Sequence, residues 1–396
     1  MKPLRILVVD DSVVIRKLLL ETLAKEELFE VVGSASDGRI ALSKIDQLKP
    51  DLVTLDLEMP VMNGLETLAE LRKSHPALPV IMFNTLTERG VSATLDALSL
   101  GAADYATKPS SAVNPASAID AIQAELIPKI KAFCGVRPTP KFAPTLSRIS
   151  PRSISRHPIE IVAIGTSTGG PNALAEVLPN IPKDLPVPIV VVQHMPPVFT
   201  RLLAERLATQ SEIPISEGTA GQELVPGHAW VAPGNYHMTI ARAGLRWSLN
   251  LDQGPPEHSC RPAVDVMFRS VAEAFKSRVL GVIMTGMGSD GVLGSRRIRE
   301  AGGQVIVQDE ASSVIWGMPG LVYAAGQADG IYPLHQLVRK SLVVFCRAAP
   351  NRPLWIRWIE WAWRLEGNDG RNPSYACACN CSSRRSCSRP CVSTHA

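Results

Sequence analysis

Short apolar runs alternate with amphipathic stretches along most of this 396-residue chain, and this alternation restricts the fold more than any other feature. In the first third, β-type runs occur at 6–9, 31–32, 52–55, 80–83 and 105–107. Amphipathic stretches occur at 12–25, 38–48, 64–75, 87–100 and about 116–132. Strands that alternate with helices predict a parallel sheet with helices on both faces. The functional crevice of such a sheet lies at the carboxyl ends of its strands.

A second alternating pattern begins at residue 160, after a proline-rich segment at 135–158. Its strand runs lie at 161–164, 189–192, 229–231, 279–284 and 305–307, with a hairpin through 237–249. Its helical stretches lie near 171–178, 198–209, 263–276, 292–301 and 334–346. We therefore expect an α/β protein with two doubly wound parallel-sheet domains, joined by a Pro-rich linker that is semi-rigid where prolines cluster.

The charge distribution argues against a nucleic-acid-binding surface. The chain has a formal net charge of +4, but residues 347–396 contribute eight arginines against three acidic residues. Residues 1–346 are therefore close to neutral and present no cationic field that would attract DNA. No apolar run reaches the roughly 18–20 residues that span a bilayer, and the run at 6–9 is too short for a signal peptide. We expect a cytoplasmic protein without membrane insertion.

Four charged side chains follow strands of the first pattern. Asp10 and Asp11 follow the first strand, Asp56 follows the third and Lys108 follows the fifth. A single aspartate at a strand end is usually a helix cap, but three carboxylates at one sheet edge suit Mg²⁺, which prefers hard oxygen ligands. The arrangement indicates an aspartate that accepts a phosphoryl group, with Mg²⁺ and a lysine neutralising the charge.

The second pattern carries a motif for a nucleophilic serine. Gly165-Thr166-Ser167-Thr168-Gly169 follows a strand, precedes a helix and satisfies G-x-S-x-G. Because glycine-rich turns also bind phosphates, a nucleotide site is the competing interpretation of this motif alone. His194 and Asp290 follow two other strands, and a serine nucleophile needs such a base and carboxylate. The chain order Ser–His–Asp differs from that of α/β-hydrolases and indicates another scaffold.

Three segments of the first pattern resemble a known family. They are Val8-Val9-Asp10-Asp11-Ser12, Asp56-Leu57-Glu58-Met59-Pro60-Val61-Met62-Asn63-Gly64 and Lys108-Pro109. They look like the receiver domain of two-component response regulators, which is flavodoxin-like. The resemblance implies that Asp56 is phosphorylated, that Asp10, Asp11 and Asp56 bind Mg²⁺, and that Lys108 contacts the phosphoryl group. It places Tyr105 at the aromatic switch position.

One position departs from the receiver pattern. Asn84 stands where the family has a hydroxyl residue that contacts the phosphoryl group, and Thr85 follows it directly. An amide can donate a hydrogen bond but has a different reach. The departure is consistent with a weakened switch or with substitution by Thr85, and phosphoacceptance itself is expected to persist.

The segments around Ser167, His194 and Asp290 resemble the catalytic domain of chemotaxis protein-glutamate methylesterases. Further matching stretches are Trp230-Val231-Ala232-Pro233-Gly234, Cys260-Arg261-Pro262-Ala263-Val264-Asp265 and Trp316-Gly317-Met318-Pro319. The resemblance implies a Rossmann-like domain in which Ser167 is the nucleophile, His194 the base and Asp290 the orienting acid. It also implies that the backbone N–H of Met287 contributes to the oxyanion hole and that the hydrolase site uses no cofactor.

The family resemblance covers about residues 1–346 and implies an activity. The protein is expected to hydrolyse glutamate γ-methyl esters on chemotaxis receptors and to deamidate specific receptor glutamines. A chemotaxis histidine kinase would phosphorylate the receiver domain, which blocks the active site until then. The alternative is a catalytically silent phospho-switch that binds receptors or the kinase. A DNA-binding response regulator would need a helix-turn-helix after the linker, where this sequence has an α/β pattern instead.

These features divide the chain into a receiver domain at 1–125, a linker at 126–157, a methylesterase domain at 158–347 and an atypical tail at 348–396. The tail has four tryptophans between 355 and 363 and five cysteines between 377 and 391, without periodicity. The cysteines lack the paired C-x₂-C spacing of zinc sites. A non-native or frame-shifted, unstructured terminus is the favoured interpretation; a tryptophan-rich segment that contacts a partner or a membrane surface and a metal site are the alternatives.

Overall fold

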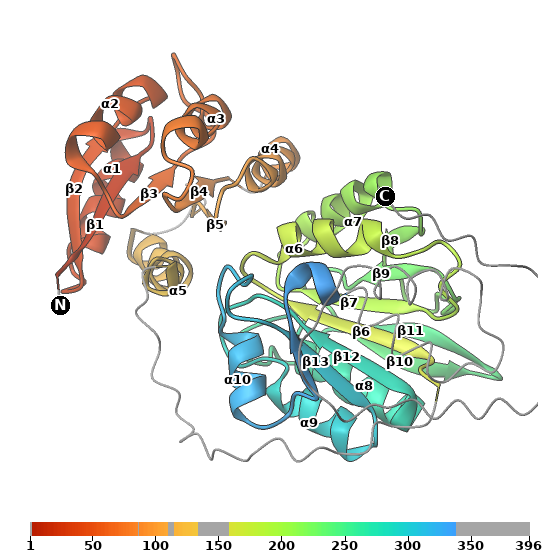
Figure 1. The fold of residues 1–396 in the computed structure, drawn as a ribbon. Coiled ribbons are helices and arrows are strands. Elements are labelled where there is room, and N and C mark those ends of the chain that lie inside the picture. Colours follow the sequence, from red (N-terminus) through yellow and green to blue (C-terminus); the bar gives the residue numbers. More distant parts are fainter. Residues whose placement is uncertain (1, 86, 110–114, 134–157, 338–396) are drawn as a thin grey trace, which may run out of the picture. The chain divides into compact units, whose positions relative to one another are not determined.

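A computed structural model describes residues 2–85, 87–109, 115–133 and 158–337 (Figure 1). Within these ranges the chain forms two α/β domains, each built on its own parallel sheet. The predicted fold class is therefore confirmed for both domains. The predicted linker from 134 onward and the whole tail lie outside the described residues.

The first domain contains a five-stranded parallel sheet in the order β2-β1-β3-β4-β5. Its strands are β1 (Leu4–Val9), β2 (Phe29–Ala35), β3 (Leu52–Leu55), β4 (Val80–Asn84) and β5 (Asp104–Thr107). The helices are α1 (Val13–Leu23), α2 (Gly38–Leu48), α3 (Gly64–Ser74), α4 (Glu88–Ser99) and α5 (Pro115–Phe133). This strand order is that of the flavodoxin-like fold, in which ligands bind where the order reverses, between the first and third strands.

The core of the first domain extends beyond the boundary at residue 125 that the sequence suggested. Helix α5 continues to Phe133. Its residues Leu126, Ile127 and Ile130 are at most 3% exposed and pack in one cluster with Ile6 and Leu19. Residues 126–133 therefore belong to the first domain, because their apolar side chains complete its core.

The second domain contains a seven-stranded parallel sheet in the order β14-β13-β12-β6-β7-β9-β8. Its strands are β6 (Ile161–Thr166), β7 (Ile189–Gln193), β8 (Ile215–Glu217), β9 (Ala229–Val231), β12 (Val279–Ile283), β13 (Gln304–Gln308) and β14 (Gly330–Tyr332). The predicted hairpin is formed by β10 (His237–Ala243) and β11 (Arg246–Asp252). Since β6 is flanked by β7 on one side and β12 on the other, the chain reverses its winding direction at β6.

Helices cover both faces of this second sheet (Figure 1). They are α6 (Gly170–Val177), α7 (Phe199–Gln210), α8 (Val264–Phe275), α9 (Val292–Glu300) and α10 (Met318–Ala324), with single 3₁₀ turns η1 (Leu178–Asn180) and η2 (Lys276–Arg278). Strands β8 and β14 and helix α10 were not predicted, because the two three-residue strands are not fully buried apolar runs as β9 is, and seven residues are too few for a helical period. The predicted helix at 334–346 is described only at residues 334–337, which are helical; the rest of the prediction lies outside the described residues.

Candidate functional site

The phosphoacceptor residues of the first domain meet at the carboxyl end of its sheet. Lys108 Nζ lies 2.8 Å from Asp10 Oδ2 and 2.7 Å from Asp56 Oδ2. Asp10 and Asp56 are buried, whereas Asp11 is exposed at the rim. The backbone N–H of Ser12 donates to Asp10 Oδ1 and so orients this carboxylate. Four residues that are separated by up to 98 positions in the sequence therefore form one cluster of charged side chains.

The electrostatics of this cluster suit a cation. Burial raises the pKa of Asp56 to about 6; the charge of Lys108 acts against this rise and that of Asp10 adds to it. One oxygen from each of Asp10, Asp11 and Asp56 lies within 4.8 Å of the others. Asp56 Oδ1 is buried and has no hydrogen-bond partner among the described residues. An unpaired carboxylate oxygen beside two further acids fits the hard, multiply charged ligand set of Mg²⁺.

Of the remaining receiver residues, Asn84 and Tyr105 lie on the neighbouring strands β4 and β5, and Thr85 directly follows β4. Asn84 ends β4, is 5% exposed, and its Nδ2 has no hydrogen-bond partner among the described residues. Its carbonyl oxygen accepts from the N–H of Lys108 at 2.7 Å. Thr85 is exposed, and Tyr105 lies on β5 with Lys129 Nζ 4.7 Å from its ring centroid. The backbone of Asn84 is therefore bonded to that of Lys108, and the N–H groups of its side-chain amide remain available to donate to a ligand.

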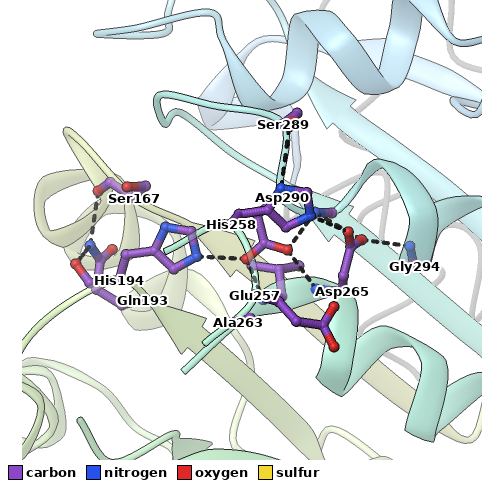
Figure 2. A network of polar contacts seen from close by, with 12 residues as sticks. Ser167, Gln193, His194, Glu257, His258, Ala263, Asp265, Ser289, Asp290 and Gly294 are labelled. Carbon is purple, nitrogen blue, oxygen red and sulfur yellow. Dashed lines mark hydrogen bonds and ion pairs between the residues drawn. The ribbon is translucent and has the colours of Figure 1, made fainter. Parts of the chain in front are cut away.

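Ser167, His194 and Asp290 occupy the ends of three adjacent strands in the second domain. Ser167 follows β6, His194 follows β7, and Asp290 lies in the loop after β12. Because β12, β6 and β7 are neighbours at the point where the winding direction reverses, their carboxyl ends converge on one crevice. The His194 ring lies between Ser167 and Asp290 in the view of Figure 2.

A part-buried hydrogen bond joins the histidine to the aspartate. His194 Nε2 donates to Asp290 Oδ2 at 2.8 Å, which leaves Nδ1 as the nitrogen that can accept a proton. Burial acts to lower the pKa of His194, but hydrogen bonds with Asp290 and Cys260 outweigh it and raise this pKa above 6.5. For Asp290, burial is outweighed by the bonds from His194 and two backbone N–H groups, which lower its pKa. The pair therefore favours a carboxylate that stabilises an imidazolium.

The backbone of Ser167 is held by three hydrogen bonds. Its N–H donates to Thr285 O at 3.1 Å, and its carbonyl accepts from the N–H of Gly170 at 2.8 Å and from Gln193 Nε2 at 2.9 Å. The N–H of Gly170 is therefore already paired, which argues against the competing interpretation of this turn as a phosphate cradle. The side chain is half-buried. Its hydroxyl makes no hydrogen bond within the described ranges, and a serine–histidine contact that tightens only with substrate is common in free enzymes.

The loop after β12 passes very close to the serine. A Cβ added to Gly286 would lie 2.8 Å from Ser167 Cβ, so only glycine permits this approach. The carbonyl of Gly286 accepts from the N–H groups of Gly317 and Met318, at 3.1 and 2.8 Å, and this fixes the loop. The N–H of the next residue, Met287, has no hydrogen-bond partner in the described part of the chain. Met287 follows Gly286, which contacts Ser167, and its N–H is available to donate to an oxyanion, as an oxyanion hole requires.

Sequence reasoning did not assign a role to three side chains around the histidine–aspartate pair. Asp265 and His258 form a second hydrogen-bonded pair beside Asp290, and Cys260 contributes to the raised pKa of His194. The stretch from Cys260 to Asp265 was recognised only as matching the methylesterase family. An aspartate in the first turn of a predicted helix was the available signal for Asp265, and an ordinary helix-dipole interaction explains such a residue equally well.

Fold and site together define a class of protein: a response-regulator receiver domain in one chain with a hydrolytic parallel-sheet domain that has serine, histidine and aspartate at its switch point. Comparison with known proteins agrees. The family model "Response regulator receiver domain" matches residues 6–120, and "CheB methylesterase" matches residues 162–340. The chain belongs to the family of protein-glutamate methylesterase/protein-glutamine glutaminases.

Curated relatives match over nearly their whole length. "Protein-glutamate methylesterase/protein-glutamine glutaminase" of Trichodesmium erythraeum is 51% identical over 348 residues, which is 86% of this chain and 99% of the relative. The protein of the same name from a Nocardioides species is 46% identical, over 89% of this chain and 98% of the relative. A crystal structure of the Thermotoga maritima CheB methylesterase catalytic domain is 41% identical, covers 47% of this chain and 98% of that domain, and has a TM-score of 0.46.

None of the helices in the described residues is long and apolar enough to cross a membrane.

Proposed function

We propose that this protein is a phosphorylation-activated esterase that hydrolyses glutamate γ-methyl esters on chemotaxis receptors and deamidates specific receptor glutamines. The observation that carries the proposal is the hydrogen bond of 2.8 Å between His194 Nε2 and Asp290 Oδ2, at the strand ends that also present Ser167. This bond orients an imidazole whose second nitrogen, Nδ1, would act as the base. Membership of the methylesterase/glutaminase family supports the choice of ester and amide substrates.

The chemistry follows from the position of each group. Ser167 Oγ attacks the ester carbonyl and gives its proton to His194 Nδ1, while Asp290 stabilises the imidazolium. The N–H of Met287 donates to the developing oxyanion. The imidazolium then protonates the departing methoxide, and methanol leaves an acyl-enzyme. A water molecule, deprotonated by the same histidine, releases the glutamate; with a glutamine side chain the first leaving group is ammonia.

The receiver domain supplies the regulation. Asp56 carries the unpaired buried oxygen that would attack a phosphoryl donor, and Lys108 would neutralise charge on the transferred group. Asp10, Asp11 and Asp56 would hold a Mg²⁺ ion, which neutralises phosphoryl oxygens when bound. The donor would be a chemotaxis histidine kinase, and the receptors would be the substrates. Asn84, with Thr85, would contact the phosphoryl group and Tyr105 would report its presence. This scheme places the protein in the cytoplasm, where kinase and receptor methylation sites are found.

Methanol release from methylated chemoreceptors, measured with and without acetyl phosphate and Mg²⁺, tests the proposal. We expect release from the wild-type protein, an increase with the phosphodonor, and ammonia release from receptors that carry glutamine at the modification sites. Receptor binding without either product, in the presence of phosphodonor, would identify a catalytically silent phospho-switch instead. Ser167→Ala serves as the blank, because only the hydroxyl is lost.

A further inference from the structure

Two helices of the catalytic domain cap each other: an aspartate beside each helix accepts hydrogen bonds from the first backbone N–H groups of the other. Neither α8 nor α9 has a side-chain cap of its own. Asp290, which precedes α9, accepts from the first-turn N–H groups of α8: Val264 N to Oδ2 at 2.6 Å and Asp265 N to Oδ1 at 2.8 Å. In return, Asp265 Oδ1 accepts from the N–H groups of Gly291 and Gly294 at the start of α9, at 3.0 and 2.6 Å.

The reciprocal contact surrounds the catalytic carboxylate with fixed donors (Figure 2). Asp290 Oδ1 also accepts from the N–H of Gly291 at 2.9 Å, so its two oxygens receive three backbone bonds and one from His194. Rotation of this carboxylate would break these bonds together. Because Asp265 holds the turn that follows Asp290, it fixes the direction in which Oδ2 faces His194.

Asp265 has a histidine partner of its own. Its side chain is fully buried, and its Oδ2 accepts from His258 Nε2 at 2.9 Å. The His258 side chain is 30% exposed, and its Nδ1 lies 3.4 Å from Ser289 Oγ. A buried carboxylate that lost this partner would be costly. The His258–Asp265 pair thus repeats the geometry of the His194–Asp290 pair, with the two aspartates side by side.

We propose that Asp265 is a positioning residue for the hydrolytic reaction, which holds the Asp290 carboxylate against His194, and that His258 keeps the Asp265 side chain in place for this task. The inference rests on the proposed function, since it concerns the same site. It assigns no contact with substrate to either residue. Asp265 acts in two ways. It fixes the orientation of the Asp290 carboxylate through its bonds to the start of α9, and its own negative charge adds to that of Asp290 near His194.

Several charged groups face this pair of aspartates and enter the expected pH dependence. His194 and His258 bond directly to Asp290 and Asp265, respectively. Arg269 on α8 interacts electrostatically with both aspartates and is ion-paired with Glu257. Cys260 lies beside His194. Asp265→Asn removes only the charge of Asp265 and keeps every other residue of this set, and the His258 variants measure separately what the partner of Asp265 contributes to the pH profile.

The test compares Asp265→Asn, Asp265→Ala, His258→Ala and His258→Gln in the full-length protein, activated by phosphodonor. Asparagine can still accept from Gly291 and Gly294 but removes the charge, so we expect the acid limb of the kcat/KM profile to move to lower pH. Alanine also removes the capping oxygens, and kcat should fall about 10- to 100-fold at unchanged KM, as expected for a misplaced catalytic group. His258→Ala should lower kcat, and His258→Gln, which keeps a donor, should restore it.

The matched control is Asp329→Asn, which removes a carboxylate that accepts from Val305 N near the start of β13, away from the catalytic edge. It should leave kcat and the pH profile unchanged, and thermal unfolding of every variant reports any loss of fold. A folded Asp265→Asn variant with the wild-type pH profile, together with Asp265→Ala at the wild-type kcat, would overturn the inference.

A second readout separates this inference from the proposed function. The rate at which a fluorophosphonate labels Ser167 depends on the serine–histidine–aspartate arrangement but not on any receptor. If the wild-type protein is labelled at Ser167 yet releases no methanol, the proposed function fails. In that case slower labelling of Asp265→Ala than of wild type and Asp329→Asn still supports the positioning role, and equal labelling contradicts it.

Discussion

The Asp290 carboxylate accepts a hydrogen bond from Nε2 of His194, not from Nδ1, at a distance of 2.8 Å. The tautomer with a proton on Nε2 is therefore the one that the neutral pair adopts, and Nδ1 is the basic nitrogen. These two residues are 96 positions apart in the sequence, and they meet because β7 and β12 both flank β6. The relationship leads to predictions about both residues and about the serine they serve.

Replacing Ser167 with alanine should abolish methanol release. The hydroxyl is the attacking group, and the members of a catalytic triad act as a unit, so His194→Ala should cost nearly as much, on the order of 10³-fold or more. Receptor demethylation with purified full-length protein measures both. Ser211→Ala is the control, because this hydroxyl is buried without a hydrogen-bond partner in the described structure and takes no part in the site. Near-normal methanol release from the Ser167 variant would show that another residue is the nucleophile.

The pH dependence of kcat/KM should reveal the raised pKa of His194. The base must be neutral to accept the serine proton, so activity is low below this pKa and rises as the pH passes through it. Because the bond to Asp290 holds the pKa above 6.5, the acid limb should lie above that value. Asp290→Asn removes the charge, so the acid limb should move to lower pH and the plateau rate should fall. The same change in the catalytic triad of a serine protease lowers kcat by on the order of 10⁴-fold. An acid limb in the wild type at or below 6.5 would contradict the geometry.

Asp56→Asn should remove stimulation by acetyl phosphate and Mg²⁺ without changing the basal rate. The amide cannot attack a phosphoryl group, whereas the hydrolase domain is untouched by the change. Phosphorylation measured on Phos-tag gels and methanol release measured in parallel provide the check. Asp51→Asn is the matched control: this aspartate precedes β3, accepts from the N–H of Arg5, and lies at the opposite end of the strand from Asp56. If Asp56→Asn is still stimulated, phosphorylation occurs at another residue.

Gly286→Ala should lower kcat strongly, because the new methyl group displaces the nucleophilic serine or the loop beside it. The new methyl group would lie 2.8 Å from Ser167 Cβ and 2.5 Å from Met318 Sδ, so the serine or the loop must shift. A displacement of about 1 Å can cost roughly 10²-fold in rate. Gly244→Ala is the comparison: it lies in the β10–β11 turn with φ of +63° and open space around it. That variant should lose some thermal stability and keep full kcat; equal kcat in both variants would argue against the tight approach at Gly286.

Deleting residues 348–396 should leave the melting temperature and the phosphodonor-stimulated rate unchanged. Those residues lie outside the described structure, and the prediction rests on their change in composition and on the end of the family resemblance near Cys346. The deletion should also reduce thiol-dependent aggregation, since five of the eight cysteines are lost. Loss of receptor demethylation with retained cleavage of a small ester would identify the tail as a docking segment.

Sequence periodicity was sufficient for most of the fold because most strands of both sheets are short runs of four to seven residues with clear boundaries. It failed for β8, β14 and α10, whose short segments are defined by neighbours in the sheet rather than by their own pattern. It also placed the end of the first domain at 125, whereas Leu126, Ile127 and Ile130 are buried in that domain's core. Burial against distant residues decided each of these cases.

The sequence by itself determined which groups stand at strand ends: Ser167, His194 and Asp290 in one domain, Asp10, Asp56 and Lys108 in the other. Local patterns suffice for this, because a strand and the loop that follows it are read from adjacent residues. Only the tertiary structure decided the strand order that brings these groups together, the histidine nitrogen that faces Asp290, and the exchange of carboxylates between Asp265 and Asp290. The physical reason is that hydrogen-bond partners and burial are set by contacts between segments far apart in the chain, and no local pattern encodes which segments will meet.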